Sequence, residues 1–334
     1  MLFRTSPSRL VIWAALFALP SFVWASPILD PGAPGGLTLY SLSSVPGFSS
    51  QFPNGYFLEG LAINGGNLLV SIADPTVVTH QTVWSMPLVR NDGHITSVGA
   101  ATLYASVPSD IAGNLPGGGL IPTANALLYT TQAESLFGQY VSPSASSLLA
   151  IHPISGGTIG GMNYIPAGQT GAGLLELSSS SQDGTWYTMT VNGTPGSYTI
   201  SSLVASATGA PAYSFAYLPA DATFNFPSVV LGDGTNLDLY HLDGAGNPCT
   251  STTAGCASVV HLVDSVDSFI GYGVVRDPVS GDILFTTGNN LIWVVSDTIP
   301  EPSTMVLAIG GMALLAGFAG RTPRSARVPL DPLC

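Results

Sequence analysis

Short apolar runs separated by turn-forming residues are the feature of residues 26–298 that most constrains the fold. The runs hold β-branched, aromatic and aliphatic residues, and the breaks between them contain Gly, Asn, Asp or Pro. Runs of this kind are typical of strands, and Asp-Gly and Asn-Gly pairs between them are typical of hairpin turns. With 39 Gly and 26 Pro in 334 residues, few uninterrupted windows remain for long helices. The body of the chain is therefore predicted to be all-β.

Five segments of this body follow one plan: a Gly-containing approach, a turn with Asn or Asp, an apolar strand, a gap and another strand. The positions taken as equivalent are Asn67, Asn125, Thr185, Asn236 and Asp282. Their spacing is uneven and somewhat longer than the ~40–50 residues of a standard propeller blade. We predict a β-propeller of five to seven blades over residues 26–298, with Leu37–Leu42 as the strand that closes the ring. Tandem β-sandwiches are the alternative, because their strands have much the same pattern.

Positive charge is concentrated at the two ends of the chain, and negative charge in the body between them. There are 19 acidic residues against seven basic ones, all of them arginine. Residues 26–299 contain two arginines and 17 acids, a net formal charge of −15. Nucleic-acid binding requires clustered cations, so this class of function is excluded. The absence of lysine from the sequence also excludes Schiff-base chemistry on a lysine.

Residues 1–25 have the organisation of a secretory signal peptide. Arg4 and Arg9 precede the apolar run Leu10–Leu19, and Pro20 follows it. An apolar run of ten residues lies within the ~7–15 expected of such a segment. Val23 and Ala25 occupy the positions that precede a cleavage site. We therefore expect an exported protein, cleaved after Ala25.

A second apolar segment lies near the C-terminus. Residues 303–320 are 18 uncharged residues, which as a helix would extend about 27 Å, close to the thickness of the hydrocarbon core. Arg321, Arg324 and Arg327 follow it. Basic residues beside a membrane span mark the cytoplasmic side, so a transmembrane helix with an exported body is predicted.

The tail carries a family resemblance. Pro300-Glu301-Pro302, the apolar span and the arginine cluster, together residues 299–327, resemble the PEP-CTERM sorting signal of proteins exported by Gram-negative bacteria. The resemblance implies recognition by an exosortase-type transpeptidase, which cleaves near Pro-Glu-Pro and transfers the body to the cell surface or extracellular matrix. The expected partners are then the secretion machinery, this sorting enzyme and, for the precursor, the inner membrane. Residues 328–334 form a short tail beyond the pattern.

Two cysteines lie in a polar loop of the exported body. Cys249 and Cys256 are separated by six residues, and an oxidising compartment favours a disulfide between them. A metal site is the weaker interpretation, since no second pair of Cys or His residues accompanies them.

One short motif bears on metal chemistry. Tyr56-Phe-Leu-Glu59-Gly60 resembles the first-blade Glu-Gly of gluconolactonase- and regucalcin-type propellers. That resemblance implies a divalent cation, calcium or another, held by Glu59 with residues from other blades, and Asn125 and Asp277 are the candidates by blade position. The alternative is that Glu59 lies on a channel rim and binds no metal. Asp233, Asp238 and Asp243 lack the EF-hand spacing and are expected to form a solvated acidic loop.

Two functions follow. The first is a non-enzymatic surface or matrix protein without a cofactor, whose propeller is an interaction platform. An exopolysaccharide, a surface protein or another copy of the chain all fit as its ligand. The second is a metal-dependent hydrolase or lactonase that uses Glu59. The sequence contains no His-Glu-x-x-His, Gly-x-Ser-x-Gly or P-loop motif.

Overall fold

The computed structural model describes most of the body of the chain. The described residues are 26–42, 56–73, 80–108, 116–123, 126–131, 136–141, 145–151, 159–181, 183–221, 224, 227–250, 259–264 and 269–297. By internal contacts the chain divides into Met1–Thr298 and Ile299–Cys334, and all described residues belong to the first unit. The predicted signal peptide and transmembrane segment lie outside the described residues. Within the described part, no helix is both long and apolar enough to cross a membrane.

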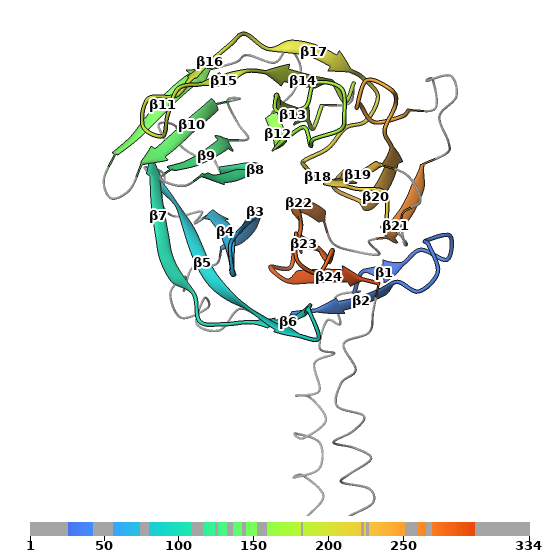
Figure 1. Ribbon diagram of the computed structural model, residues 1–334. Coiled ribbons are helices and arrows are strands. Elements are labelled where there is room, and N and C mark those ends of the chain that lie inside the picture. The colour runs from blue at the N-terminus through green and yellow to red at the C-terminus, as the bar shows by residue number, and fades with distance from the viewer. Residues whose placement is uncertain are drawn as a thin grey trace, which may run out of the picture. The chain divides into compact units, whose positions relative to one another are not determined.

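Antiparallel sheets of four or five strands are arranged radially around one axis (Figure 1). The described residues form five such sheets and one two-stranded hairpin, so the body is a five-bladed β-propeller. The prediction of an all-β propeller is confirmed, at the lower end of the expected blade number.

Blades 1 to 3 each begin with the strand nearest the axis and continue outward. Blade 1 consists of β3 (Phe57–Asn64), β4 (Asn67–Ala73), β5 (His80–Asn91) and β7 (Thr102–Pro108), with β6 (His94–Val98) paired to the end of β5. Blade 2 consists of β8 (Pro116–Thr123), β9 (Ala126–Thr131), β10 (Leu136–Val141) and β11 (Ala145–Ile151). Blade 3 consists of β12 (Ile159–Tyr164), β13 (Leu175–Ser179), β14 (Trp186–Met189) and β17 (Val204–Ala207), and the hairpin of β15 (Val191–Asn192) and β16 (Thr199–Ile200) extends beyond β14.

Blades 4 and 5 take their outermost strands from the N-terminal part of the body. Blade 4 consists of β18 (Ser214–Leu218), β19 (Ser228–Gly232), β20 (Asn236–His241), β21 (Val260–Asp264) and β1 (Ile28–Leu29). Blade 5 consists of β22 (Ile270–Arg276), β23 (Ile283–Thr287), β24 (Ile292–Ser296) and β2 (Thr38–Ser41). Because β2 pairs with β24 from Thr38↔Ser296 to Ser41↔Trp293, the predicted closing strand within Leu37–Leu42 is confirmed.

Five hydrophobic clusters lie between neighbouring blades, one at each junction. Successive residues of a strand point to opposite faces of its sheet. In β9, Leu127 packs toward blade 1 and Leu128 toward blade 3. In β23, Leu284 packs toward blade 1 and Phe285 toward blade 4. Burial of both faces explains why the second strands β4, β9, β19 and β23 contain continuous apolar runs. In β13, by contrast, Glu176 lies between Leu175 and Leu177.

In four blades, a hydroxyl side chain on the second strand accepts a hydrogen bond from a backbone amide of the innermost strand. Four amides of inner-strand glycines donate to these hydroxyls over 2.7–3.3 Å: Gly60 to Ser71, Gly119 to Thr130, Gly161 to Ser178 and Gly273 to Thr286. The same four inner strands carry irregularities in register, which interrupt the ladder. Three of the hydroxyls also donate to a carbonyl of the next blade, at Gly160, Ala212 and Glu59. One side chain thus completes a strand and joins two blades.

Blade 4 departs from this plan in a way that fits its crowding. Gly232 occupies the hydroxyl position, and a Cβ there would lie 2.5 Å from the Cα of Gly271 in blade 5. The hydroxyl is supplied instead by Ser214 of the inner strand, which accepts from the amide of Val274 over 2.6 Å.

The junction of blades 5 and 1 is held by a set of polar contacts that we call the closing clamp. Arg90 of β5 donates from Nη2 and Nε to the two carboxylate oxygens of Asp277, over 2.9 and 3.1 Å. Four residues later, His94 Nδ1 lies 2.9 Å from Oδ1 of Asp282, whose Oδ2 accepts from the amide of Ile95 over 2.8 Å. Both aspartates are fully buried, at the two ends of the turn between β22 and β23. One hairpin of blade 1 therefore holds a whole turn of blade 5.

The expected repeat register is correct in three segments and shifted in two. Asn67 begins β4, and Asp282 directly precedes β23, each the second strand of its blade. Asn125 lies outside the described residues, directly before the second strand β9. Thr185 and Asn236, in contrast, introduce β14 and β20, which are third strands. The buried hydroxyl residues lie on the second strand in four blades, so they identify equivalent positions of the repeat better than the turn residues do.

The first prediction concerns the hydroxyls. Thr286→Val leaves the buried amide of Gly273 and the carbonyl of Glu59 without a partner, so we expect a loss of about 1–3 kcal/mol in the free energy of unfolding. The exposed Thr190 provides the control, and Thr190→Val should change stability by less than about 0.5 kcal/mol. Urea unfolding of the full chain in mild detergent, followed by tryptophan fluorescence, measures both. Equal losses in the two variants would contradict the role of the hydroxyl.

The second prediction concerns the clamp. Arg90→Gln leaves the buried carboxylate of Asp277 unpaired and should cost about 3–5 kcal/mol at neutral pH. Burial raises the pKa of Asp277, but hydrogen bonds from Arg90 and Ser280 outweigh it, so the net pKa is lowered. Without Arg90 this pKa rises, and the deficit in stability should shrink as acid protonates Asp277. Unfolding curves between pH 4 and 7 test this, with Arg90→Gln/Asp277→Asn as the variant expected to recover part of the loss.

Candidate functional site: an axial funnel

The inner strands of three blades meet across the propeller axis. Gly118 of β8 lies against the backbone of blades 4 and 5, because a Cβ at this position would overlap the carbonyl oxygens of Tyr213 and Tyr272. Only glycine permits so close an approach of backbones. This contact closes the axis at the level of Gly118.

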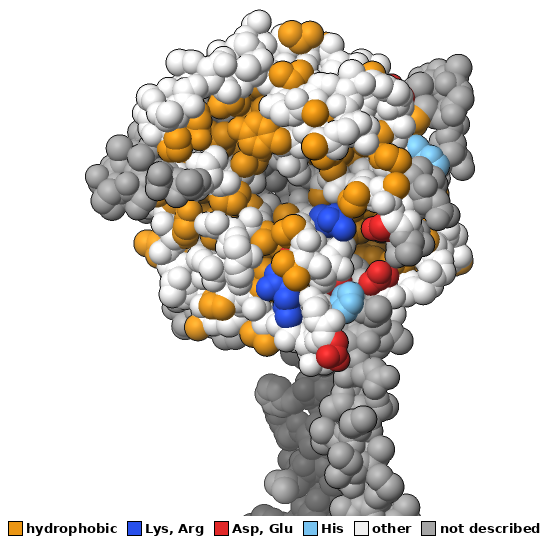
Figure 2. Space-filling model, in the orientation of Figure 1, with side chains coloured by type: hydrophobic (Ala, Val, Ile, Leu, Met, Phe, Trp, Pro, Cys, Tyr) orange, Lys and Arg blue, Asp and Glu red, His pale blue; other side chains and the backbone are white. Residues whose placement is uncertain are grey.

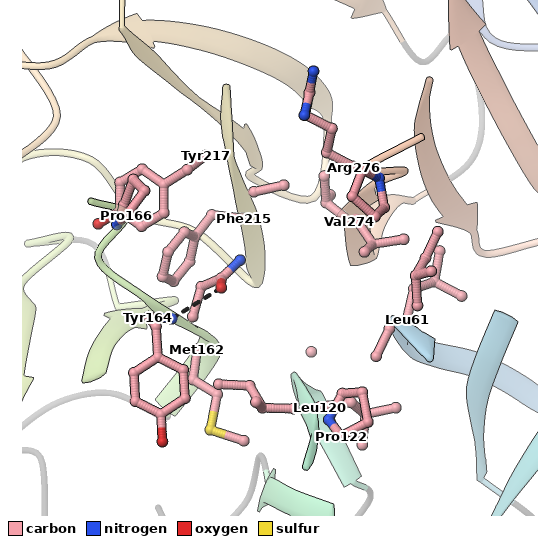
Figure 3. Close-up of a pocket in the computed structure, with 18 residues that line it drawn as sticks. Leu61, Leu120, Pro122, Met162, Tyr164, Pro166, Phe215, Tyr217, Val274 and Arg276 are labelled. Atoms are coloured by element: carbon pink, nitrogen blue, oxygen red, sulfur yellow. Dashed lines mark hydrogen bonds between the residues drawn. The ribbon is translucent and has the colours of Figure 1, made fainter. Parts of the chain in front are cut away.

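Beyond this contact the C-terminal halves of the inner strands spread apart and leave a cavity of about 360 Å³, which we call the axial funnel. Its lining comes from all five inner strands and the loops that follow them: Leu61, Ala62, Ile63, Gly118, Leu120, Ile121, Pro122, Met162, Asn163, Tyr164, Pro166, Phe215, Ala216, Tyr217, Val274, Val275, Arg276 and Pro278. Figure 3 shows the labelled side chains around the hollow, with Tyr217 and Pro166 facing Leu61 and Val274 across it. In Figure 2, a depression at the centre of the face is bordered by hydrophobic side chains.

The blade 4 side of the funnel is braced by aromatic rings. The rings of Phe215 and Tyr217 meet edge to face, with their centroids 5.7 Å apart. The ring centroid of Phe215 also lies 4.6 Å from that of Trp186 in blade 3. The Tyr217 hydroxyl donates to Oε2 of Glu176, which is fully buried in blade 3. Burial raises the pKa of Glu176 to about 8, so this carboxyl is mostly protonated at neutral pH. The ring of Tyr217 is thereby fixed in position by a neutral hydrogen bond across the blade junction.

Polar groups in the funnel are few. Asn163 accepts from the amide of Tyr164 through Oδ1 over 2.9 Å, which leaves its Nδ2 as a donor. Arg276, half-buried at the end of β22, is the charged residue of the lining. The funnel therefore combines apolar and aromatic walls with hydrogen-bond donors, the pattern of a small-molecule site.

Glu59, the residue singled out for metal binding, lies on β3 and is 1% exposed. Its Oε2 has no hydrogen-bond partner among the described residues. Burial raises the pKa of Glu59 well above the ordinary range. Burial raises the pKa of the Tyr272 hydroxyl, and the nearby Glu59 carboxyl adds to this effect.

Of the two proposed partners of Glu59, Asp277 is described, and its carboxylate is engaged elsewhere. The carboxylate of Asp277 is taken up by Arg90 and Ser280 in the turn after β22, while the backbone of Glu59 packs against Gly273 earlier in that strand. Asn125 lies outside the described residues. Across the described part of the chain, no group of three or more His, Cys, Asp or Glu side chains is placed to hold a metal.

A serine, a histidine and an aspartate do meet at the closing clamp. Ser296 Oγ lies 3.1 Å from Nδ1 of His94, and Oδ1 of Asp282 lies 2.9 Å from the same nitrogen. A catalytic triad requires the acid on one ring nitrogen and the nucleophile on the other. Because Ser296 is also 1% exposed, we interpret this group as structural.

The remaining predicted sites divide into described and undescribed residues. Cys249 is 3% exposed and disulfide-bonded, and Cys256 lies outside the described residues. The cleavage position Ala25 and the sorting residues also lie outside them, namely Pro300, Glu301, Pro302, Arg321, Arg324 and Arg327.

The prediction of a solvated acidic loop is wrong for Asp238. Asp238 is 5% exposed, and its Oδ1 lies 2.7 Å from Nδ1 of His261. Burial raises the pKa of Asp238 to about 6. Asp233 and Asp243 instead accept backbone amides of their own turns.

Comparisons with known proteins do not assign the chain to a family. A scan against protein-family models finds no match, and a search of curated protein sequences finds none either.

The funnel residues carry no local motif and were not found from the sequence. Glycine pairs offered a signal, because Gly118-Gly119, Gly160-Gly161 and the pair Gly271 and Gly273 all lie in inner strands. Locating the inner strands this way would have placed Asn163 and Arg276, two to three residues farther along, at the axis.

The third prediction concerns Glu176. Because its folded-state pKa is raised, the stability that it contributes is present below its ordinary pKa and is lost as pH rises through about 8. In Glu176→Gln, this decline should disappear; its steepest slope is roughly 1.4 kcal/mol per pH unit. Free energies of unfolding between pH 5 and 9 provide the measurement, with the exposed Asp92→Asn as a charge-matched control. A decline that persists unchanged in Glu176→Gln would show that another group causes it.

Proposed function

We propose that this chain is an exported five-bladed propeller that is sorted to the cell surface or extracellular matrix, where it acts as a non-enzymatic interaction protein. A cationic start and an apolar run support export. The Pro-Glu-Pro tripeptide, apolar span and arginine cluster of residues 299–327 support sorting by an exosortase-type transpeptidase. Two prolines fix φ and remove backbone donors, which favours an extended segment that a processing enzyme can reach.

The observation that carries the interaction role is the axial funnel. All five inner strands contribute to its lining, and its volume of about 360 Å³ lies in the range of small-molecule sites. The floor at Gly118 and the aromatic brace of Tyr217 are built into the ring itself. A preformed cavity of this kind binds a ligand without reorganising the protein.

The alternative function is a metal-dependent hydrolase or lactonase that uses Glu59. Its support is the unpartnered, buried carboxyl oxygen of that residue. Burial raises the pKa of Glu59, so a cation would compete with a proton for this carboxyl. Titration of the full chain with Ca²⁺ or Zn²⁺ separates the two functions. Stoichiometric binding that is lost in Glu59→Gln would favour the metal-dependent role over the interaction role.

The fourth prediction tests export and sorting together. In the native host, the surface form should begin at Ser26 and end close to Pro302, as read from its intact mass. Glu301→Ala with Pro302→Ala should leave an anchored form that retains the arginine cluster, whereas Pro329→Ala should be processed like the natural chain. A mature surface form that still extends to Cys334 would overturn the sorting proposal.

A further inference from the structure

The two arginines of the body, Arg90 and Arg276, differ in their hydrogen-bond partners. Arg90 forms two hydrogen bonds to the buried carboxylate of Asp277. Arg276, the neighbour of Asp277 in sequence, forms no hydrogen bond or ion pair with the rest of the described chain. Guanidinium groups carry five donors and are stabilised by a planar, bidentate anion when they leave water. Arg276 is half-buried, lines an apolar cavity and has no partner in the described chain. Its guanidinium is therefore suited to binding an anionic ligand.

Acidic residues near Arg276 limit how much negative charge a bound ligand can carry. A smaller cavity of about 60 Å³ lies on the other side of Arg276 and is lined by Asp221 and Asp297. Both of these acids have other interactions. Their negative charge, added to the net −15 of residues 26–299, opposes a dianion or a polyanion at this site. One carboxylate is matched by one guanidinium, whereas a phosphate dianion would need further cations.

The walls limit the shape of the guest. Leu61, Leu120, Met162 and Val274 contribute aliphatic walls to the funnel, and the backbone contact at Gly118 lies at its floor. A long extended chain could not pass this floor, so the apolar part of the guest must be compact. Tyr217 offers a ring braced by Glu176, against which a flat apolar body can pack. Asn163, on β12, adds a donor from a blade other than that of Arg276.

From this geometry we propose that the axial funnel binds a small organic monoanion, in which a single carboxylate is joined to a compact apolar or aromatic body. Arg276 pairs with the carboxylate at the mouth, and the apolar body lies between Tyr217 and the aliphatic walls. The proposal rests on the interaction role of the funnel and names the class of ligand for it. No bond is formed or broken in the bound molecule.

The experiment uses matched probes and the full chain in mild detergent. Isothermal titration compares phenylacetate with phenylacetamide, which has the same body but no charge. Phenylacetate should bind at least roughly tenfold more tightly, because a charge-assisted pair replaces a neutral contact. In Arg276→Gln the two probes should bind equally, at the affinity of the amide for the natural protein. Arg276→Lys retains the positive charge but loses the bidentate geometry of the guanidinium. Its preference for phenylacetate should lie between those of the natural chain and Arg276→Gln.

Several outcomes would overturn the proposal. They are equal binding of the two probes to the natural chain, an unchanged preference in Arg276→Gln, tighter binding of phenylphosphonate dianion or of glucose, and no saturable binding of any probe. Thermal unfolding should be unaffected by Arg276→Gln, since Arg276 has no partner in the described chain to lose. The mass of the surface form is measured independently, so failure of ligand binding in a correctly processed protein rejects this ligand class and leaves the sorting proposal standing.

Discussion

Burial of both faces of every sheet is the constraint on which this structure depends. Each blade presents apolar side chains to two neighbours, so a blade at the end of a row would expose one of its faces to water. A closed ring is the arrangement that leaves no such end. A bidentate ion pair and further hydrogen bonds to buried carboxylates accordingly lie at the junction of the first and last blades, where the ring closes. There Arg90 and His94 hold the two buried aspartates of a single turn, and β2 completes the last sheet.

A ring of five blades brings the inner strands unusually close together, and small residues make this possible. Glycines at positions such as Gly118 and Gly232 let backbones touch where any Cβ would collide. The irregular strands that result would leave amides unpaired, and the buried hydroxyls of Ser71, Thr130 and Thr286 accept from them. The same crowding that closes the axis at one level opens the funnel beyond it. The shape of the candidate site is therefore a consequence of how the core is packed.

Much of the architecture could be predicted from the sequence, because it depends on local patterns. Turn dipeptides between apolar runs indicated the strands, and Leu37–Leu42 was recognised as an unpartnered strand that could close the ring. The register of the repeats failed at Thr185 and Asn236, because a turn residue followed by a short strand precedes third strands as well as second strands. Site residues were harder still. The partners Arg90 and Asp277 are 187 residues apart, and no local pattern reveals such a pair. Glu59 was found from a short motif, but its burial depends on neighbouring blades.

The placement of β1 and β2 has a consequence for biogenesis. These segments are synthesised before the rest of the described body, yet β1 pairs with β21 and β2 pairs with β24 at its C-terminal end. Loop closure over more than 230 residues is slow, and chains dominated by such distant pairings fold slowly. If the protein is exported as proposed, the amino-terminal strands must wait, unpaired, on the far side of the membrane while the rest is translocated. The assembled ring is then a late event, and a chaperone that shields these two strand edges would act during that interval.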